Sequence, residues 1–219
     1  MSKRTFTITA ELQDYVLAHS TPLDDVARDL IEETYRTLPD RSGMQIAPEQ
    51  AVFLTLLTRV LGVRQAVEVG TFTGLSALAI ARGLADGGKL LCCDVSEEWT
   101  SVARRYWERA GVADRIELRL APALETLRSL RNEPYLDLAF IDADKPGYIG
   151  YWDELVPRMQ PGGVILVDNT LYSGRVIDST VTDERTQGIR DFNDHAAADE
   201  RVEIVLLPVA DGLTIARKR

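Results

Sequence analysis

The first sixty residues carry apolar side chains at helical spacing, and no stretch among them alternates as a strand would. Helices are predicted at 10–18, 23–35 and 48–61. Thr21-Pro22 separates the first two, and a loop over 38–43 precedes the third. This part of the chain is therefore expected to form a helical addition to whatever follows it.

From Ala66 onward the pattern becomes an alternation of short apolar strands and amphipathic helices. Strands are predicted at 66–69, 89–94, 115–120, 135–141 and 163–167, and helices at 75–85, 97–110, 122–131 and 147–159. Repeated βα units predict a parallel sheet with right-handed crossovers.

The last forty residues predict a helix and then a hairpin. A helix over 183–198 is followed by strands at 202–207 and 213–216, and the short connection between them permits only antiparallel pairing. The expected fold is α/β with a mostly parallel seven-stranded sheet. We expect one domain over 1–219, with the helical addition at 1–62 and the sheet core at 63–219.

Composition narrows the class of protein. With 45% hydrophobic and 27% charged residues, the 219-residue chain is typical of a globular protein with a buried core. Its net charge of −9 disfavours a nucleic-acid partner, because phosphate binding requires clustered Lys and Arg. No signal-peptide or transmembrane pattern is present, so we expect a cytoplasmic protein that does not contact membranes. Cys92 and Cys93 are adjacent on a predicted strand and are interpreted as buried apolar residues.

Two apolar strands end in polar runs. Phe140-Ile141 leads into Asp142-Ala143-Asp144-Lys145, and Val164–Val167 leads into Asp168-Asn169. Ligands of open α/β sheets bind at the carboxyl ends of the strands. Carboxylate and amide oxygens from Asp142, Asp168 and Asn169 suit Mg²⁺, Mn²⁺ or Ca²⁺, and Lys145 would stand beside the ion as a candidate base. Taken singly, each of these side chains has an ordinary alternative as a helix cap or turn residue.

A glycine turn follows the first predicted strand. Gly70 and Gly74 enclose Thr71-Phe72-Thr73, and the acidic Asp94 ends the next strand twenty positions after Gly74 (94 − 74 = 20). Small residues there would let a nucleotide-like ligand approach, and Asp94 could accept hydrogen bonds from its ribose. The missing G-x-G-x-x-G fingerprint disfavours a nicotinamide-dependent oxidoreductase. Glu68 would repel a pyrophosphate but tolerate the cationic sulfonium of S-adenosylmethionine (SAM).

These three motifs, in this order, resemble the cation-dependent O-methyltransferases, which include the catechol and caffeoyl-CoA O-methyltransferases. The resemblance runs from Met44 to the terminal hairpin and implies a Rossmann-like SAM-dependent methyltransferase fold. It implies roles for individual residues as follows. The SAM contacts would be Glu68, Gly70, Thr71, Ser76, Asp94, Ala123 and Asp142; the metal ligands Asp142, Asp168 and Asn169; the catalytic residues Lys145 and Asp142; and the acceptor contacts Met44, Tyr148 and Tyr172.

Two positions depart from the family pattern. Ala121 stands where many relatives have glycine, and Tyr172 where many have tryptophan, so the acceptor preference is left open. The activity that the resemblance implies is methylation of a catechol-type, vicinal dihydroxy aromatic small molecule. The alternatives are a methyltransferase of a hydroxylated tRNA wobble base and a non-catalytic SAM-binding regulator. The resemblance also implies a homodimer.

Overall fold

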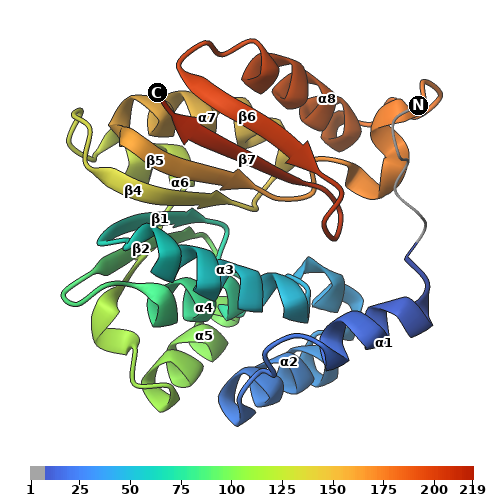
Figure 1. Ribbon diagram of the computed structural model, residues 1–219, viewed down its shortest axis with the longest axis vertical. Helices are drawn as coiled ribbons and strands as arrows, with labels where there is room; N and C mark the ends of the chain where they lie inside the picture. The colour runs from blue at the N-terminus through green and yellow to red at the C-terminus, as the bar shows by residue number, and fades with distance from the viewer. Residues whose placement is uncertain (1–7) are drawn as a thin grey trace.

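A seven-stranded sheet forms the centre of the protein in the computed structural model, which describes residues 8–219 (Figure 1). The strand order is β3-β2-β1-β4-β5-β7-β6, and β7 alone runs antiparallel to its two neighbours, β5 and β6. The strands are β1 (Gln65–Val69), β2 (Lys89–Asp94), β3 (Ile116–Leu120), β4 (Leu136–Ile141), β5 (Met159–Val167), β6 (Val202–Leu207) and β7 (Leu213–Lys218). The predicted α/β fold, including the terminal hairpin, is confirmed.

Helices cover both faces of this sheet. They are α1 (Ala10–Ala18), α2 (Asp25–Thr37), α3 (Pro48–Leu61), α4 (Leu75–Gly83), α5 (Glu97–Arg109), α6 (Ala123–Arg128), α7 (Tyr148–Leu155) and α8 (Glu184–Ala197). In Figure 1, α3, α4 and α5 lie on the lower side, α1 and α2 lie outside them, α8 lies at the top, and α6 and α7 are partly hidden behind the strands. Residues of α6, α7 and α8 share one apolar core, and residues of α3, α4 and α5 share the other. Each layer has its own apolar core, one around Leu78 and Leu54, the other around Trp152 and Phe192. Burial on both sides explains why the central strands are continuously apolar.

The two largest differences from the predicted boundaries, four residues each, are at the end of α7 and the start of β5. The helix expected over 147–159 stops at Leu155, and the 3₁₀ turn η4 (Val156–Arg158) follows because Pro157 lacks the amide hydrogen that a longer helix needs. Strand β5 begins at Met159, four residues before the predicted start (163 − 159 = 4), and its register against β4 shifts at Leu136/Leu138. Neither difference moves the carboxyl end of a strand, which is where the polar runs lie.

The loops after β1, β4 and β5 are joined through their backbones. The Asp142 amide donates to the Val69 carbonyl, and the Asp168 amide donates to the Ile141 carbonyl, each at 2.9 Å. Gly70 lies so close to the next loop that a Cβ there would be 2.0 Å from the Asp142 carbonyl oxygen. The glycine turn and the two acidic runs therefore meet at one edge of the sheet. Within residues 8–219, no helix has the length and apolar character needed to span a membrane.

Candidate active site

Lys145 lies at the centre of the polar cluster on this edge. It opens the 3₁₀ turn η3 (Lys145–Gly147), and its side chain is only 11% exposed. Its Nζ is 3.1 Å from Asp142 Oδ1, 2.6 Å from Asn169 Oδ1 and 2.5 Å from the Tyr148 hydroxyl. The structure thus brings together Lys145, Asp142 and Asn169, although 24 residues separate the first from the last.

Asp168 is buried beside this cluster. Its Oδ1 accepts from the Asn169 amide at 2.8 Å, and its Oδ2 accepts from Gln50 Nε2 at 2.9 Å. Burial, and then the neighbouring charge of Asp142, raises the pKa of Asp168 well above its ordinary value. Asn169 adopts a left-handed conformation with φ 58°, which asparagine tolerates better than most residues. Asp142 Oδ1 and Asn169 Oδ1 thus share Lys145 Nζ, and the Asp168 carboxylate lies close enough to Asp142 for the two charges to repel.

No group of three His, Cys, Asp or Glu side chains that could hold a metal ion exists in the described part of the chain. The cluster at Lys145 contains only two carboxylates, and its third oxygen comes from an amide. Hard cations such as Mg²⁺ also use amide oxygens and keep several water ligands, so few carboxylates are needed.

Tyr148 lies beneath Lys145 rather than on a surface open to an acceptor. The residue is 0% exposed, and its hydroxyl accepts from Lys145 and donates to the main-chain carbonyl of Asp168 at 3.1 Å. Burial raises the pKa of the Tyr148 phenol far above its ordinary value, so the hydroxyl keeps its proton. The expectation of direct contact between Tyr148 and an acceptor does not fit this burial.

The Asp94 side chain organises the glycine turn by binding backbone amides of the turn. One carboxylate oxygen accepts from the amides of Thr71 and Phe72 at 2.9 and 2.8 Å; the other accepts from those of Val95 and Ser96 at 2.7 and 2.8 Å. Four backbone donors share the carboxylate that was expected to receive ribose hydroxyls. Asp94 thus fixes the shape of the turn, a role that its position at a strand end did not reveal.

Glu68 lies under the same turn and is fully buried. Its Oε2 accepts from the Thr71 hydroxyl at 3.1 Å, while its buried Oε1 has no partner. Burial raises the pKa of Glu68 to about 7. A raised pKa keeps more of the carboxyl protonated near neutral pH, which weakens its repulsion of a phosphate and with it the electrostatic reason for expecting a sulfonium ligand. The side chain supports Thr71 and presents no open surface.

The remaining residues expected on the SAM side lie in the helices that follow β1 and β3. Ser76 is buried in the first turn of α4, which begins directly after Gly74, and Ala123 is the first residue of α6 beyond β3. Gly74 itself packs on Ala103 and Trp107 of α5, with the Trp107 ring nitrogen donating to the Gly74 carbonyl at 3.1 Å. Trp107 is therefore a core residue, and it is not available to a partner subunit.

The expected acceptor side is formed by two loops. Met44 ends the 3₁₀ segment η1 (Pro39–Met44) and is 45% exposed. Tyr172 begins the segment η5 (Tyr172–Ile177), which is bent by left-handed conformations at Tyr172, Ser173 and Gly174. The turn between β6 and β7 supports η5: the backbone amide of Tyr172 donates to the Asp211 carbonyl at 3.3 Å, and that of Ser173 donates to the Asp211 carboxylate.

Sequence reasoning missed two glutamines of the helical addition. Gln50 of α3 reaches Asp168, which is 118 residues away, and it is 1% exposed. Gln45 donates to the hydroxyls of Thr34 and Thr73 at 3.1 and 3.2 Å, and Thr73 belongs to the glycine turn. No sequence signal marks these residues, because a polar residue near a helix start is normally solvated. The helical addition is thus attached both to the glycine turn and to the acidic run that follows β5.

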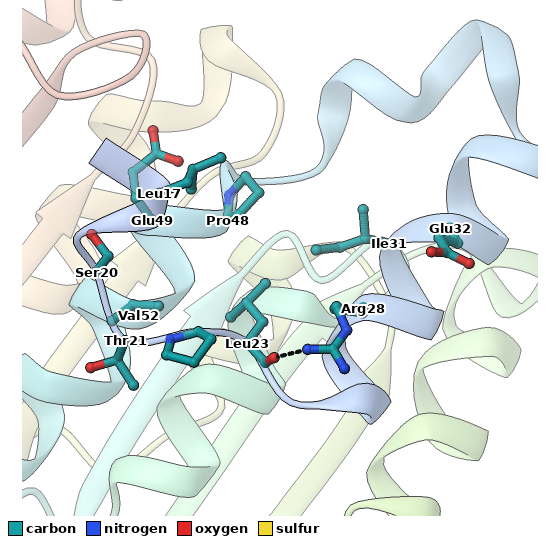
Figure 2. A pocket seen from close by; sticks show the side chains of 11 residues that line it. Leu17, Ser20, Thr21, Leu23, Arg28, Ile31, Glu32, Pro48, Glu49 and Val52 are labelled. Atoms are coloured by element: carbon teal, nitrogen blue, oxygen red, sulfur yellow. Dashed lines mark hydrogen bonds between the residues drawn. The ribbon is translucent and has the colours of Figure 1, made fainter. Parts of the chain in front are cut away.

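A cavity of about 320 Å³ lies elsewhere, between the α1–α2 connection and the first turn of α3. Figure 2 shows Leu17, Pro48 and Val52 around it, with Arg28 donating to the Leu23 carbonyl. None of the residues expected to bind SAM, metal or acceptor lines this cavity.

Comparison with known proteins agrees with this fold. A solved O-methyltransferase from Bacillus cereus in complex with SAH superimposes with a TM-score of 0.87 and 34% identity, covering 95% of this chain and 97% of that one. The fold and site define a SAM-dependent methyltransferase. An O-methyltransferase family model matches residues 17–219, and the chain belongs to that family.

Two curated relatives indicate the type of O-methyltransferase. A protein of Dictyostelium discoideum named "Probable caffeoyl-CoA O-methyltransferase 2" is 40% identical over 209 residues, covering 94% of this chain and 90% of its own. The mouse "Catechol O-methyltransferase domain-containing protein 1" is 38% identical over 173 residues, covering 78% of this chain and 66% of its own. The protein is an O-methyltransferase of the caffeoyl-CoA and catechol type that uses SAM.

Proposed function

We propose that this enzyme methylates one hydroxyl of a vicinal dihydroxy aromatic molecule with the help of a divalent cation. The observation that carries the proposal is the position of Lys145 Nζ, within 3.1 Å of both Asp142 Oδ1 and Asn169 Oδ1. At this position the charged ammonium of Lys145 binds two side-chain oxygens that would equally suit a metal ion.

The donor set fits a hard cation. Asp142, Asp168 and Asn169 offer oxygen ligands only, which favours Mg²⁺, with Mn²⁺ or Ca²⁺ as further possibilities. The raised pKa of Asp168 has the unfavourable proximity of Asp142 among its causes. Positive charge at this place would relieve the repulsion between the two carboxylates. When bound, such a cation would hold both acceptor oxygens and lower the pKa of the hydroxyl to be methylated.

The chain itself would align donor and acceptor and remove a proton. The glycine turn, held by Asp94, would place the SAM sulfonium beside Asp142. The acceptor oxygen forms a bond to the methyl carbon while the carbon–sulfur bond breaks, which leaves S-adenosylhomocysteine. Lys145, in its neutral form, would take the hydroxyl proton. Alignment of two reactants in one site is worth on the order of 7–11 kcal/mol in well-oriented systems.

A tRNA substrate is disfavoured by the ion pairs of α5. Each of three arginines on this helix has an acidic partner: Arg104 pairs with Glu97 at 3.0 Å, Arg105 with Glu33 at 2.5 Å and Arg109 with Asp29 at 2.6 Å. Arginines that are already paired attract RNA phosphates less strongly. A small aromatic acceptor therefore remains the better proposal.

Methyl transfer from labelled SAM tests the proposal directly. The acceptors are catechol, caffeic acid, caffeoyl-CoA and tRNA that carries a hydroxylated wobble base, each assayed with Mg²⁺ and with excess EDTA. We expect methylation of the vicinal dihydroxy compounds, loss of activity in EDTA and recovery on adding Mg²⁺. Full activity in excess chelator would contradict the metal-dependent mechanism, and methylation of a monohydroxy analogue at equal rate would contradict the acceptor class.

A further inference from the structure

The three hydrogen-bond partners of Lys145 are not equivalent. An ammonium carries three N–H donors and no acceptor, and here its neighbours Asp142, Asn169 and Tyr148 each supply one oxygen. Two of these oxygens belong to residues that the proposed function assigns to the cation. The Tyr148 hydroxyl is the one partner with no such competing role.

The Tyr148 hydroxyl is oriented to receive Lys145. Its proton is directed to the Asp168 carbonyl oxygen at 3.1 Å, so a lone pair of the phenol oxygen faces Nζ at 2.5 Å. The same hydroxyl therefore joins Lys145 to the main chain of the β5 turn. The contact does not involve the side-chain oxygens of Asp142 and Asn169.

The Tyr148 ring is held by α8. Phe192 contacts the ring edge-to-face with centroids 5.5 Å apart, and Trp152, one turn further along α7, also contacts Phe192 edge-to-face at 5.7 Å. Helix α8 also approaches the Lys145 backbone closely, since a Cβ on Gly188 would lie 3.0 Å from the Lys145 carbonyl oxygen. A fully buried, packed phenol has few alternative positions, so its oxygen is a fixed point for a flexible lysine.

We propose that Tyr148 is a positioning residue that holds Lys145 Nζ beside the acceptor when Asp142 and Asn169 bind the cation. The inference rests on the proposed function, because it assumes that Lys145 takes the acceptor proton. Tyr148 does not touch the acceptor, and its effect on methyl transfer passes through Lys145.

A double-mutant cycle measures this dependence. Tyr148→Phe removes the hydroxyl and keeps the ring, and we expect kcat to fall by roughly ten- to hundredfold, the loss typical of one hydrogen bond to a charged group. KM for catechol and the calorimetric affinities for SAM and Mn²⁺ should stay within about twofold of the wild-type values. In a Lys145→Met background, the same substitution should change kcat by less than about twofold, since residues that act as one unit are not additive.

Tyr106→Phe is the matched control. Tyr106 is another buried tyrosine, and its hydroxyl lies within hydrogen-bond distance of α2, 2.8 Å from Glu33 Oε2 and 3.1 Å from the Asp29 carbonyl oxygen; it joins α5 to α2 and lies outside the site. Its loss should lower the melting temperature and leave kcat unchanged. An equal fall in kcat in Tyr106→Phe would mean that lost stability explains the Tyr148 result, which would overturn the proposal.

Lysine NMR provides a readout besides activity. The chain has four lysines, so the ε-carbon of Lys145 can be assigned in ¹³C-lysine protein, and Lys89, whose Nζ donates to the Asp114 carbonyl at 2.7 Å, is the internal reference. In the Mg²⁺-loaded protein, Tyr148→Phe should increase the mobility of the Lys145 side chain and leave Lys89 unchanged. If the phenylalanine variant does not fold, 3-fluorotyrosine at position 148 weakens the acceptor oxygen, and the same measurements apply.

The outcomes distinguish the proposed role of Lys145 from the proposed role of Tyr148. A normal kcat in Lys145→Met would overturn the role of Lys145 itself. A severe loss in Lys145→Met combined with a normal kcat in Tyr148→Phe would overturn only the role of Tyr148. An equal loss from Tyr148→Phe in both backgrounds would show that it acts independently of Lys145, and unchanged Lys145 mobility would also contradict the inference.

Discussion

Gln50 Nε2 donates a hydrogen bond to Asp168 Oδ2 at 2.9 Å, and both side chains are buried. Helix α3 thus contacts the residue that follows β5, on the edge of the sheet where the polar runs meet. A buried carboxylate needs such donors, because an unpaired charge in the interior is costly. The helical addition is therefore attached directly to the candidate metal centre.

Asp168→Ala should abolish binding of the divalent cation while leaving SAM affinity largely intact, because Asp168 does not contact the glycine turn. Mn²⁺ titration calorimetry and SAM titration of the same protein measure the two affinities. Asp14→Ala, on the exposed surface of α1, is the control and should change neither. Retained Mn²⁺ affinity in Asp168→Ala would remove Asp168 from the ligand set.

Lys145→Met should retain binding of SAM, cation and catechol but lower kcat by about 10²–10⁴-fold, the usual contribution of general-base catalysis. Steady-state kinetics across a pH series checks this. The loss should shrink as pH rises, since an acceptor that is already ionised needs less help from a base. A loss that stays constant over the whole series would indicate an orienting role instead.

Asp94→Ala should weaken SAM binding by about 1.5–3 kcal/mol, the range for hydrogen bonds to a charged group. Because Asp94 also holds the amides of Thr71 and Phe72, the variant should have a lower melting temperature as well. Calorimetry and thermal unfolding measure the two effects. Asp86→Ala, in the exposed turn before β2, should change neither value. Unchanged SAM affinity in Asp94→Ala would exclude this role in cofactor binding.

Glu68→Gln should alter the dependence of stability on pH. The ordinary glutamate pKa is 4.5 and that of buried Glu68 is about 7. Between these values the unfolded chain releases the proton and the folded chain keeps it, so wild-type stability from this group falls as pH rises and is complete below pH 4.5. The free energy of unfolding of Glu68→Gln relative to wild type should therefore rise by about 3 kcal/mol over that window. Urea unfolding at several pH values measures the difference, and a constant difference would contradict it.

We expect a symmetric homodimer that covers apolar residues of the helices and the C-terminal strands. Leu56 and Val60 lie four residues apart on α3 and are 59% and 73% exposed, and Val205 on the edge strand β6 is 47% exposed. Light scattering should give twice the chain mass at micromolar concentration. Leu56→Glu combined with Val60→Glu should shift the protein to monomer, while a monomeric wild type would refute the prediction.

The positions of Asp142 and Asp168 could be predicted because each follows a buried strand, and parallel strands bring their carboxyl ends to one edge. The direction in which a side chain points could not be predicted in the same way. Tyr148 follows Lys145 by three residues, yet whether it faces an acceptor or the core depends on how α7 packs against Phe192 of α8. That contact joins segments distant in sequence, and no local pattern encodes it.

Asp94 illustrates a second limit. Its residue type and its place at the end of β2 agree equally with binding a ligand hydroxyl and with holding backbone amides, and only the folded backbone shows that four amides reach it. Gln50 illustrates a third, because its partner Asp168 is known only once α3 is placed on the sheet.

The contact of Asp211 with the η5 segment has a consequence for comparing relatives and for engineering. Residues at the tip of the C-terminal hairpin set the backbone on which Tyr172 stands, although they lie about forty positions away (211 − 172 = 39). Acceptor preference should therefore covary between these two stretches across the family. A library that varies 171–177 alone would leave unchanged the hairpin residues that also determine acceptor preference. Grafting residues 171–177 from a relative should succeed more often when the tip of its C-terminal hairpin is transferred as well.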